Sequence, residues 1–167
     1  MDIKKITTIS MLLALSIVLS IIESMIPIIS GIIPGVKLGL ANTVIIFVIY
    51  MYSFKDALFI SILRVFLVGL LRTGLFNITF FFSISGALFS IVIMCLMKNC
   101  TKLSVIGVSV MGAIFHSIGQ IIIGIVVLNT ISLIYYLPYI LLFSIPTGIV
   151  VGMASKTVLR YYRKDCN

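Results

Sequence analysis

Apolar residues follow one another almost without interruption along the chain, and only short polar or Pro- and Gly-containing stretches separate them. The apolar runs cover about residues 6–26, 38–52, 57–71, 76–97, 103–128 and 131–159. Because about 20 mostly apolar helical residues cross the hydrocarbon core of a bilayer, these runs predict six transmembrane helices. The second run is short for a crossing, so we expect it to be tilted or completed by the loop before it.

Composition supports this pattern and excludes a soluble domain. Hydrophobic residues make up 62% of the 167 residues and charged residues only 10%, and the mean hydropathy is +1.34. A soluble domain carries about 25% charged residues. We therefore expect an all-α polytopic bundle of about six transmembrane helices, with residues 1–167 forming one transmembrane domain.

The net charge of +8 is distributed in the way that membrane insertion produces. If Lys4 and Lys5 are cytoplasmic, six crossings place most other cations on the same side: Lys55, Lys98, Lys102 and the basic C-terminal segment. This asymmetry predicts a multi-pass protein with both termini in the cytoplasm. The cations are expected to contact lipid headgroups, and no exposed basic stripe indicates nucleic-acid binding.

Arg64 is the clearest candidate for a functional residue, because polar side chains inside a bilayer are costly, from about 2.5 kcal/mol upward for a central Arg. Arg64 lies about 13 Å along a helix from Lys55, which is close to the middle of the membrane. We expect it to contact a solute or to couple movements. The alternative is an Arg that is paired inside the bundle and only fixes the packing.

His116 and Gln120 are four residues apart, so they lie on the same face of the fifth predicted helix. Glycines at 112, 119 and 124 make that helix thin nearby, which favours a cavity. The competing hypothesis is a hydrogen-bonded histidine that serves packing alone.

Three further polar residues are expected near the outer end of the bundle. Glu23 and Lys37 can form the rim of the same pocket, although an interfacial ion pair worth under about 1 kcal/mol is the simpler alternative. Asn42 either faces the pocket or caps the second helix.

Small residues on the first predicted helix form two neighbouring stripes, Ser16 with Ser20 and Ser10 with Ala14. Spacing of this kind lets another helix approach closely. The partner helix is either within the same bundle or belongs to another protein.

The sequence lacks the residues that several enzyme classes require. It has four acidic residues, Asp2, Glu23, Asp56 and Asp165, and none of them form a cluster along the chain. Mg²⁺ bound to a diphosphate usually takes carboxylates together with substrate phosphates. The three cysteines form no CxxC pair and no Walker A motif is present, so we expect no metal, no cofactor and no catalysis by the chain alone.

The order of several short segments resembles one known family. These segments are Glu23-Ser24, Pro34-Gly35-Val36-Lys37-Leu38-Gly39-Leu40-Ala41-Asn42, Leu63-Arg64-Val65, Ser85-Gly86, His116-Ser117-Ile118-Gly119-Gln120 and Tyr135-Tyr136-Leu137-Pro138. Over nearly its whole length the chain resembles the Gx transporter family, whose members are also labelled heptaprenyl diphosphate synthase component I.

The resemblance implies a fold related to the S components of energy-coupling factor transporters, which are six-helix proteins of the bacterial cytoplasmic membrane. It implies that Pro34 and Gly35 form a lid over a pocket that contains Lys37 and Asn42. It also implies that the small residues Ser10, Ala14, Ser16 and Ser20 dock to a transmembrane coupling subunit bound to ATPases. Mixed Ser and Ala stand here where alanines are typical of that face.

The two family labels imply two functions. As a transporter subunit, the chain would bind a small anionic or strongly polar solute from outside, through Arg64, His116, Gln120 and Asn42 with Glu23 and Lys37 at the rim. As synthase component I, it would be a non-catalytic accessory of a soluble prenyl diphosphate synthase. The scarcity of carboxylates and the outer position of the polar residues favour transport.

Overall fold

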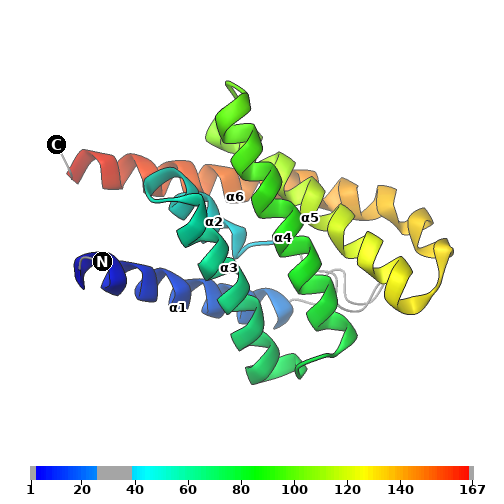
Figure 1. Ribbon diagram of the computed structural model, residues 1–167. Helices are drawn as coiled ribbons and strands as arrows, with labels where there is room; N and C mark the ends of the chain where they lie inside the picture. Colours follow the sequence, from blue (N-terminus) through cyan, green and yellow to red (C-terminus); the bar gives the residue numbers. More distant parts are fainter. Residues whose placement is uncertain (1–2, 26–38, 166–167) are drawn as a thin grey trace.

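The computed structural model describes residues 3–25 and 39–165, and this part of the chain consists of helices joined by short turns and loops, without a strand. Six α-helices follow one another with two short turns of other helical types: α1 (Ile3–Met25), α2 (Asn42–Met51), α3 (Phe54–Val68), the π-turn η1 (Gly69–Thr73), α4 (Ile78–Cys100), α5 (Val105–Leu128), the 3₁₀ turn η2 (Ile131–Tyr136) and α6 (Leu137–Asp165). Figure 1 shows them packed as a bundle. The predicted all-α bundle of six helices is confirmed.

The helices differ in whether they can cross a membrane alone. Four helical segments are long and apolar enough, namely α1, α4, α5 and the segment formed by η2 with α6. The helix α3 continues into η1, and their 20 residues span about 30 Å, which is also the thickness of the hydrocarbon core.

The second predicted crossing is shorter in the structure than its apolar run. Helix α2 has 10 residues and is about 15 Å long, which is half of a bilayer. Gly39 has a positive φ of 87°, and the turn that it begins leads into the helix only at Asn42. This left-handed backbone favours glycine and interrupts the helix that hydrophobicity alone would extend.

Close contact between α5 and α6 holds the centre of the bundle. Gly148 and Gly152 lie one turn apart on α6, and a Cβ atom at Gly152 would be 2.8 Å from Cα of Ile106 on α5. The hydroxyl of Ser109 on α5 donates to the carbonyl oxygen of Gly148 at 2.7 Å. The two backbones can approach this closely because the glycines carry no side chain.

Polar contacts join several helix ends at one end of the bundle. Nζ of Lys5 on α1 lies 2.8 Å from Oδ2 of Asp56 on α3, and Nζ of Lys98 on α4 donates to the carbonyl oxygen of Ile49 on α2 at 2.6 Å. Figure 1 places both chain termini at the same end. The side of the membrane on which they lie stays a prediction.

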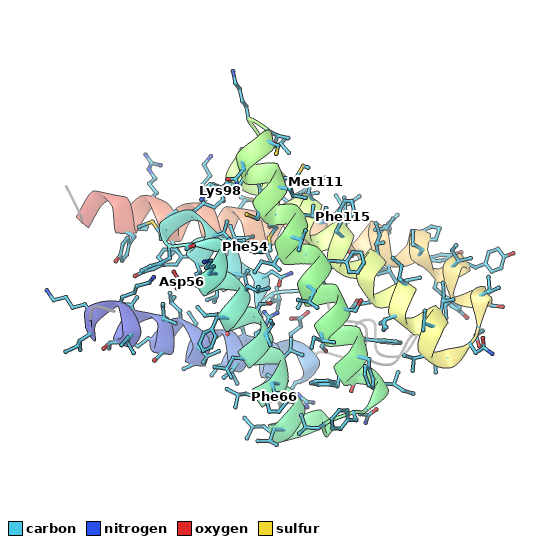
Figure 2. All side chains as sticks on the ribbon, in the orientation of Figure 1. Phe54, Asp56, Phe66, Lys98, Met111 and Phe115 are labelled. Carbon is cyan, nitrogen blue, oxygen red and sulfur yellow. The ribbon has the colours of Figure 1, made fainter. Side chains whose placement is uncertain are left out.

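Large apolar side chains cover much of the outer surface, as expected for contact with lipid. Phe66 on α3 is 47% exposed, and Phe54 at the beginning of the same helix is also exposed (Figure 2). The interior, in contrast, contains many small polar side chains. This arrangement is the reverse of a soluble bundle and fits a protein surrounded by hydrocarbon.

Replacing Gly152 with leucine is expected to destabilise the bundle. The new side chain would meet the α5 backbone, which cannot move aside cheaply, so the midpoint of thermal unfolding in detergent should fall by an amount that corresponds to at least about 1–3 kcal/mol. Ala154→Leu is the matched control, since Ala154 is exposed on the same helix and should tolerate leucine. Equal unfolding temperatures for the two variants would contradict close α5–α6 packing.

Candidate functional site

Polar side chains from four helices are buried in the interior of the bundle. Glu23 lies near the end of α1, Asn42 begins α2, Arg64 lies in the second half of α3, and His116 and Gln120 lie on α5. Each of them is at most 6% exposed. The structure therefore brings residues far apart in the sequence into one buried polar region.

Glu23 fixes the backbone that precedes α2. Its two carboxylate oxygens accept hydrogen bonds from the amide nitrogens of Gly39 and Leu40, the second at 3.1 Å. The backbone N–H of Asn42, the first residue of α2, then donates to the carbonyl oxygen of Gly39 at 2.9 Å. One acidic side chain thus ties the end of α1 to the beginning of α2.

Arg64 is the most unusual residue in this region. Its side chain is 4% exposed, and its Nη1 nitrogen has no hydrogen-bond partner among the described residues. The Glu23 carboxylate is the charge that acts on it most directly. A buried guanidinium is costly unless it is paired and hydrogen-bonded, so this nitrogen retains the capacity to donate to an acceptor.

His116 and Gln120 contact each other and press against α4. Nε2 of His116 and Nε2 of Gln120 are 3.3 Å apart, and the tautomer and amide orientation decide which group donates. A Cβ atom at Gly86 on α4 would be 3.0 Å from both side chains. Their position therefore depends on the glycine opposite them, and the predicted i, i+4 face points into the bundle.

A small cavity lies between these side chains. Its volume is about 20 Å³, which is enough for about one water molecule. Polar groups of Ser20, Glu23, Arg64, Ser83 and His116 line it together with apolar groups that include Val68, Gly69 and Phe80. In this arrangement the cavity can hold a water or a single small polar group, and a larger ligand would have to displace the surrounding side chains.

The π-turn η1 forms one wall of this cavity. Gly69 begins η1, and a Cβ atom there would be 2.8 Å from the Phe80 ring of α4. Within η1, Nη1 of Arg72 donates to the carbonyl oxygen of Ile21 on α1 at 2.9 Å. The first residue of the turn therefore packs against α4 at the cavity, and Arg72 attaches the turn to α1.

Only some of the predicted pocket residues that the structure describes line the cavity. Glu23, Arg64 and His116 line the cavity together. Gln120 reaches it only through His116, and the side-chain amide of Asn42 donates to Ser90 on α4 at 3.3 Å. The predicted rim and lid residues Lys37, Pro34 and Gly35 lie outside the described residues.

The small residues of α1 do not share one face. Ser16 and Ser20 are buried within the bundle, and Ser20 contributes to the cavity wall. Ser10 and Ala14 are exposed. Docking to a partner helix stays a prediction for the exposed pair, whereas the buried pair packs against helices of this chain.

Two cavity residues on α4, Ser83 and Phe80, were not singled out by their sequence. Ser83 follows three phenylalanines and is the first of the serines within the apolar run of α4. A serine in such a run is only a weak indication of a position in the interior, because its hydroxyl can donate to a carbonyl oxygen of its own helix. Ser83 does this by donating to the carbonyl oxygen of Thr79 at 2.7 Å.

One family model matches most of the chain. It is described as heptaprenyl diphosphate synthase component I, and it covers residues 12–158, from the middle of α1 nearly to the end of α6. No curated protein and no solved structure matches the chain.

The electrostatic dependence of Arg64 on Glu23 can be measured with a double-mutant cycle. We expect Glu23→Gln and Arg64→Met each to lower the free energy of unfolding by about 3–5 kcal/mol, because each leaves one buried charge uncompensated. The double variant should lose clearly less than the sum of the two single losses. The stability of each variant in detergent is measured by denaturant titration.

The pair Lys5 and Asp56 provides the control cycle, because both side chains are partly accessible at the end of the bundle. Its single variants should each cost about 1 kcal/mol or less. Additive losses for Glu23 and Arg64 would show that the two charges do not depend on each other.

Proposed function

Because the chain belongs to the heptaprenyl diphosphate synthase component I family, we propose that it is the membrane-embedded, non-catalytic component of a heptaprenyl diphosphate synthase. The observation that carries this proposal is the family match over residues 12–158, which includes α2, α3, α4 and α5 completely. The family label that the sequence resemblance indicated is thereby confirmed, and it favours the synthase function over transport.

The chemistry of the chain supports a division of work with a second protein. The carboxylate of Glu23 is occupied by two backbone amides, and that of Asp56 is paired with Lys5. Mg²⁺ bound to a diphosphate usually takes protein carboxylates in addition to the phosphates. A soluble prenyl diphosphate synthase would supply those carboxylates, and this chain would hold the enzyme at the bilayer.

The apolar surface of the bundle would keep a bound synthase next to the hydrocarbon of the bilayer. A polyprenyl product is a long hydrocarbon with a charged head, and its tail is far more stable in a bilayer than in water. A synthase anchored to this bundle would release the tail directly into hydrocarbon. The described surface is covered by large apolar side chains that fit such an environment.

Purification of the tagged chain from its native membrane in mild detergent tests this proposal. We expect a prenyl diphosphate synthase to co-purify, and deletion of the chain should reduce the long-chain prenyl diphosphate activity that sediments with membranes. Mass spectrometry and a radiolabelled product assay give the two readouts. An unrelated tagged multi-pass protein is the control for general detergent capture.

Recovery of a transmembrane coupling subunit and ATPases without a synthase would overturn this proposal. It would favour the second candidate function, a substrate-binding subunit of an energy-coupling-factor-type transporter. The specific observation in favour of this candidate is that Arg64 lines the cavity and that its Nη1 nitrogen has no hydrogen-bond partner among the described residues. The proposed solute-binding residues are Arg64, His116, Gln120 and Asn42, with Glu23 and Lys37 at the rim and Pro34 and Gly35 in the lid.

This second function predicts that small carboxylates or phosphates stabilise the purified protein. A ligand at one hundred times its Kd would stabilise the folded state by about 2.7 kcal/mol, which a thermal shift assay detects readily. Arg64→Met should abolish the shift because the acceptor loses its donor, whereas Asp56→Asn at the other polar contact should keep it. The same shift in both variants would place binding elsewhere.

A further inference from the structure

A second polar surface lies far from Arg64 along the chain, on the last turns of α6. Two adjoining clefts of about 340 and 320 Å³ share Lys156 and Arg160 as wall residues. We call the two clefts together the basic groove; their remaining wall residues are Tyr50 on α2, Val105 on α5, and Thr157, Leu159 and Tyr161 on α6.

The two cations of the basic groove are one helical turn apart and project from the same side of α6. Neither forms a hydrogen bond or an ion pair with the side chains that the structure describes. A third cation is close by, since Nζ of Lys98 lies 5.1 Å from the ring centroid of Tyr50. The groove therefore carries an excess of positive charge that no described carboxylate neutralises.

Apolar side chains lie directly beside these charges. The cleft between α2, α5 and α6 contains Val105 and Leu159, and its wall is mostly apolar. The N-terminus of α5 begins at Val105, so the positive end of its dipole faces the same cleft. The groove therefore offers cations to a negatively charged head group and an apolar wall to the hydrocarbon atoms next to that head group.

We propose that the basic groove binds the diphosphate head of a long-chain prenyl diphosphate and receives the first part of its hydrocarbon chain. This inference rests on the proposed synthase-component function, which supplies the class of ligand. A diphosphate carries several negative charges and can engage both cations at once, whereas the phosphodiester of a membrane lipid carries one. The groove would hold the product at the boundary between the partner enzyme and the bilayer.

The two cations of the basic groove can act on a diphosphate in different ways. The guanidinium of Arg160 can bind two phosphate oxygens at once, and Lys156 adds a compact charge on a flexible stem. The hydroxyl of Tyr50 is in the same cleft and can donate to a further oxygen.

The test uses the full-length chain in nanodiscs of phosphatidylcholine, which has no net charge, with radiolabelled geranylgeranyl diphosphate as the probe. The variant Lys156→Gln/Arg160→Gln removes the groove cations. The variant Lys4→Gln/Lys55→Gln is the matched control, because it removes the same charge from helices that do not line the groove. Competitors are geranylgeraniol, inorganic diphosphate and phosphatidylglycerol introduced into the nanodisc.

We expect saturable binding to the wild type, a loss of affinity of about tenfold or more in the groove variant, and wild-type affinity in the control variant. Inorganic diphosphate should compete and geranylgeraniol should not. Equal losses in the two variants, or no saturable binding, would overturn the proposal. Displacement by phosphatidylglycerol at equimolar amounts would assign the groove to anionic lipid instead and would overturn it as well.

The outcome is separable from that of the proposed function. Co-purification of a synthase reports on the partner alone, and it can succeed when the groove fails to bind the probe. In that case the chain is an anchor without a product site. If the probe binds and no synthase is recovered, the groove stands and the synthase function falls.

Discussion

Burial of the Arg64 guanidinium in an apolar bundle is the constraint on which the organisation of the interior depends. A charge at this depth needs a countercharge, and Glu23 is the acidic side chain that the described fold provides for it. Glu23 in turn holds the amides of Gly39 and Leu40, which position the beginning of α2. Glu23 therefore acts electrostatically on Arg64 and, through two backbone amides, also positions the first turn before α2.

Hydrophobicity along the chain was sufficient to predict the helices but not the exact extent of each. The long runs of α4 and α5 are confirmed because nothing in them interrupts a helix. The run from residue 38 to 52 contains a shorter helix than predicted, since Gly39 adopts a left-handed backbone and Glu23 binds the adjacent amides. Both causes depend on contacts with α1, and a pattern of apolar residues carries no information about them.

The polar residues of the interior could be predicted where burying the side chain in a membrane is costly enough to make the residue stand out in the sequence. Arg64, Glu23 and His116 stand out in an apolar sequence, and the structure brings them to one cavity. Ser20 was assigned to a docking face because small residues permit both internal and external helix contacts, and only the packing of α1 distinguishes the two. The volume of the cavity could not be inferred either, because it depends on how closely its walls approach one another, as Gly69 and Phe80 do.

The π-turn η1 sets the rotation of the residues that follow α3, including Arg72. A π-turn accommodates one more residue than an α-helical turn, so every side chain after it is rotated by about 100° relative to a continuous α-helix. Arg72 lies in the last part of the turn, and there it donates to the carbonyl oxygen of Ile21. Loss of a single residue would restore ordinary helical geometry and turn Arg72 away from α1. An insertion or deletion in this segment would therefore change the rotational register of Arg72 relative to α1, whatever the chemistry of the inserted or deleted residue.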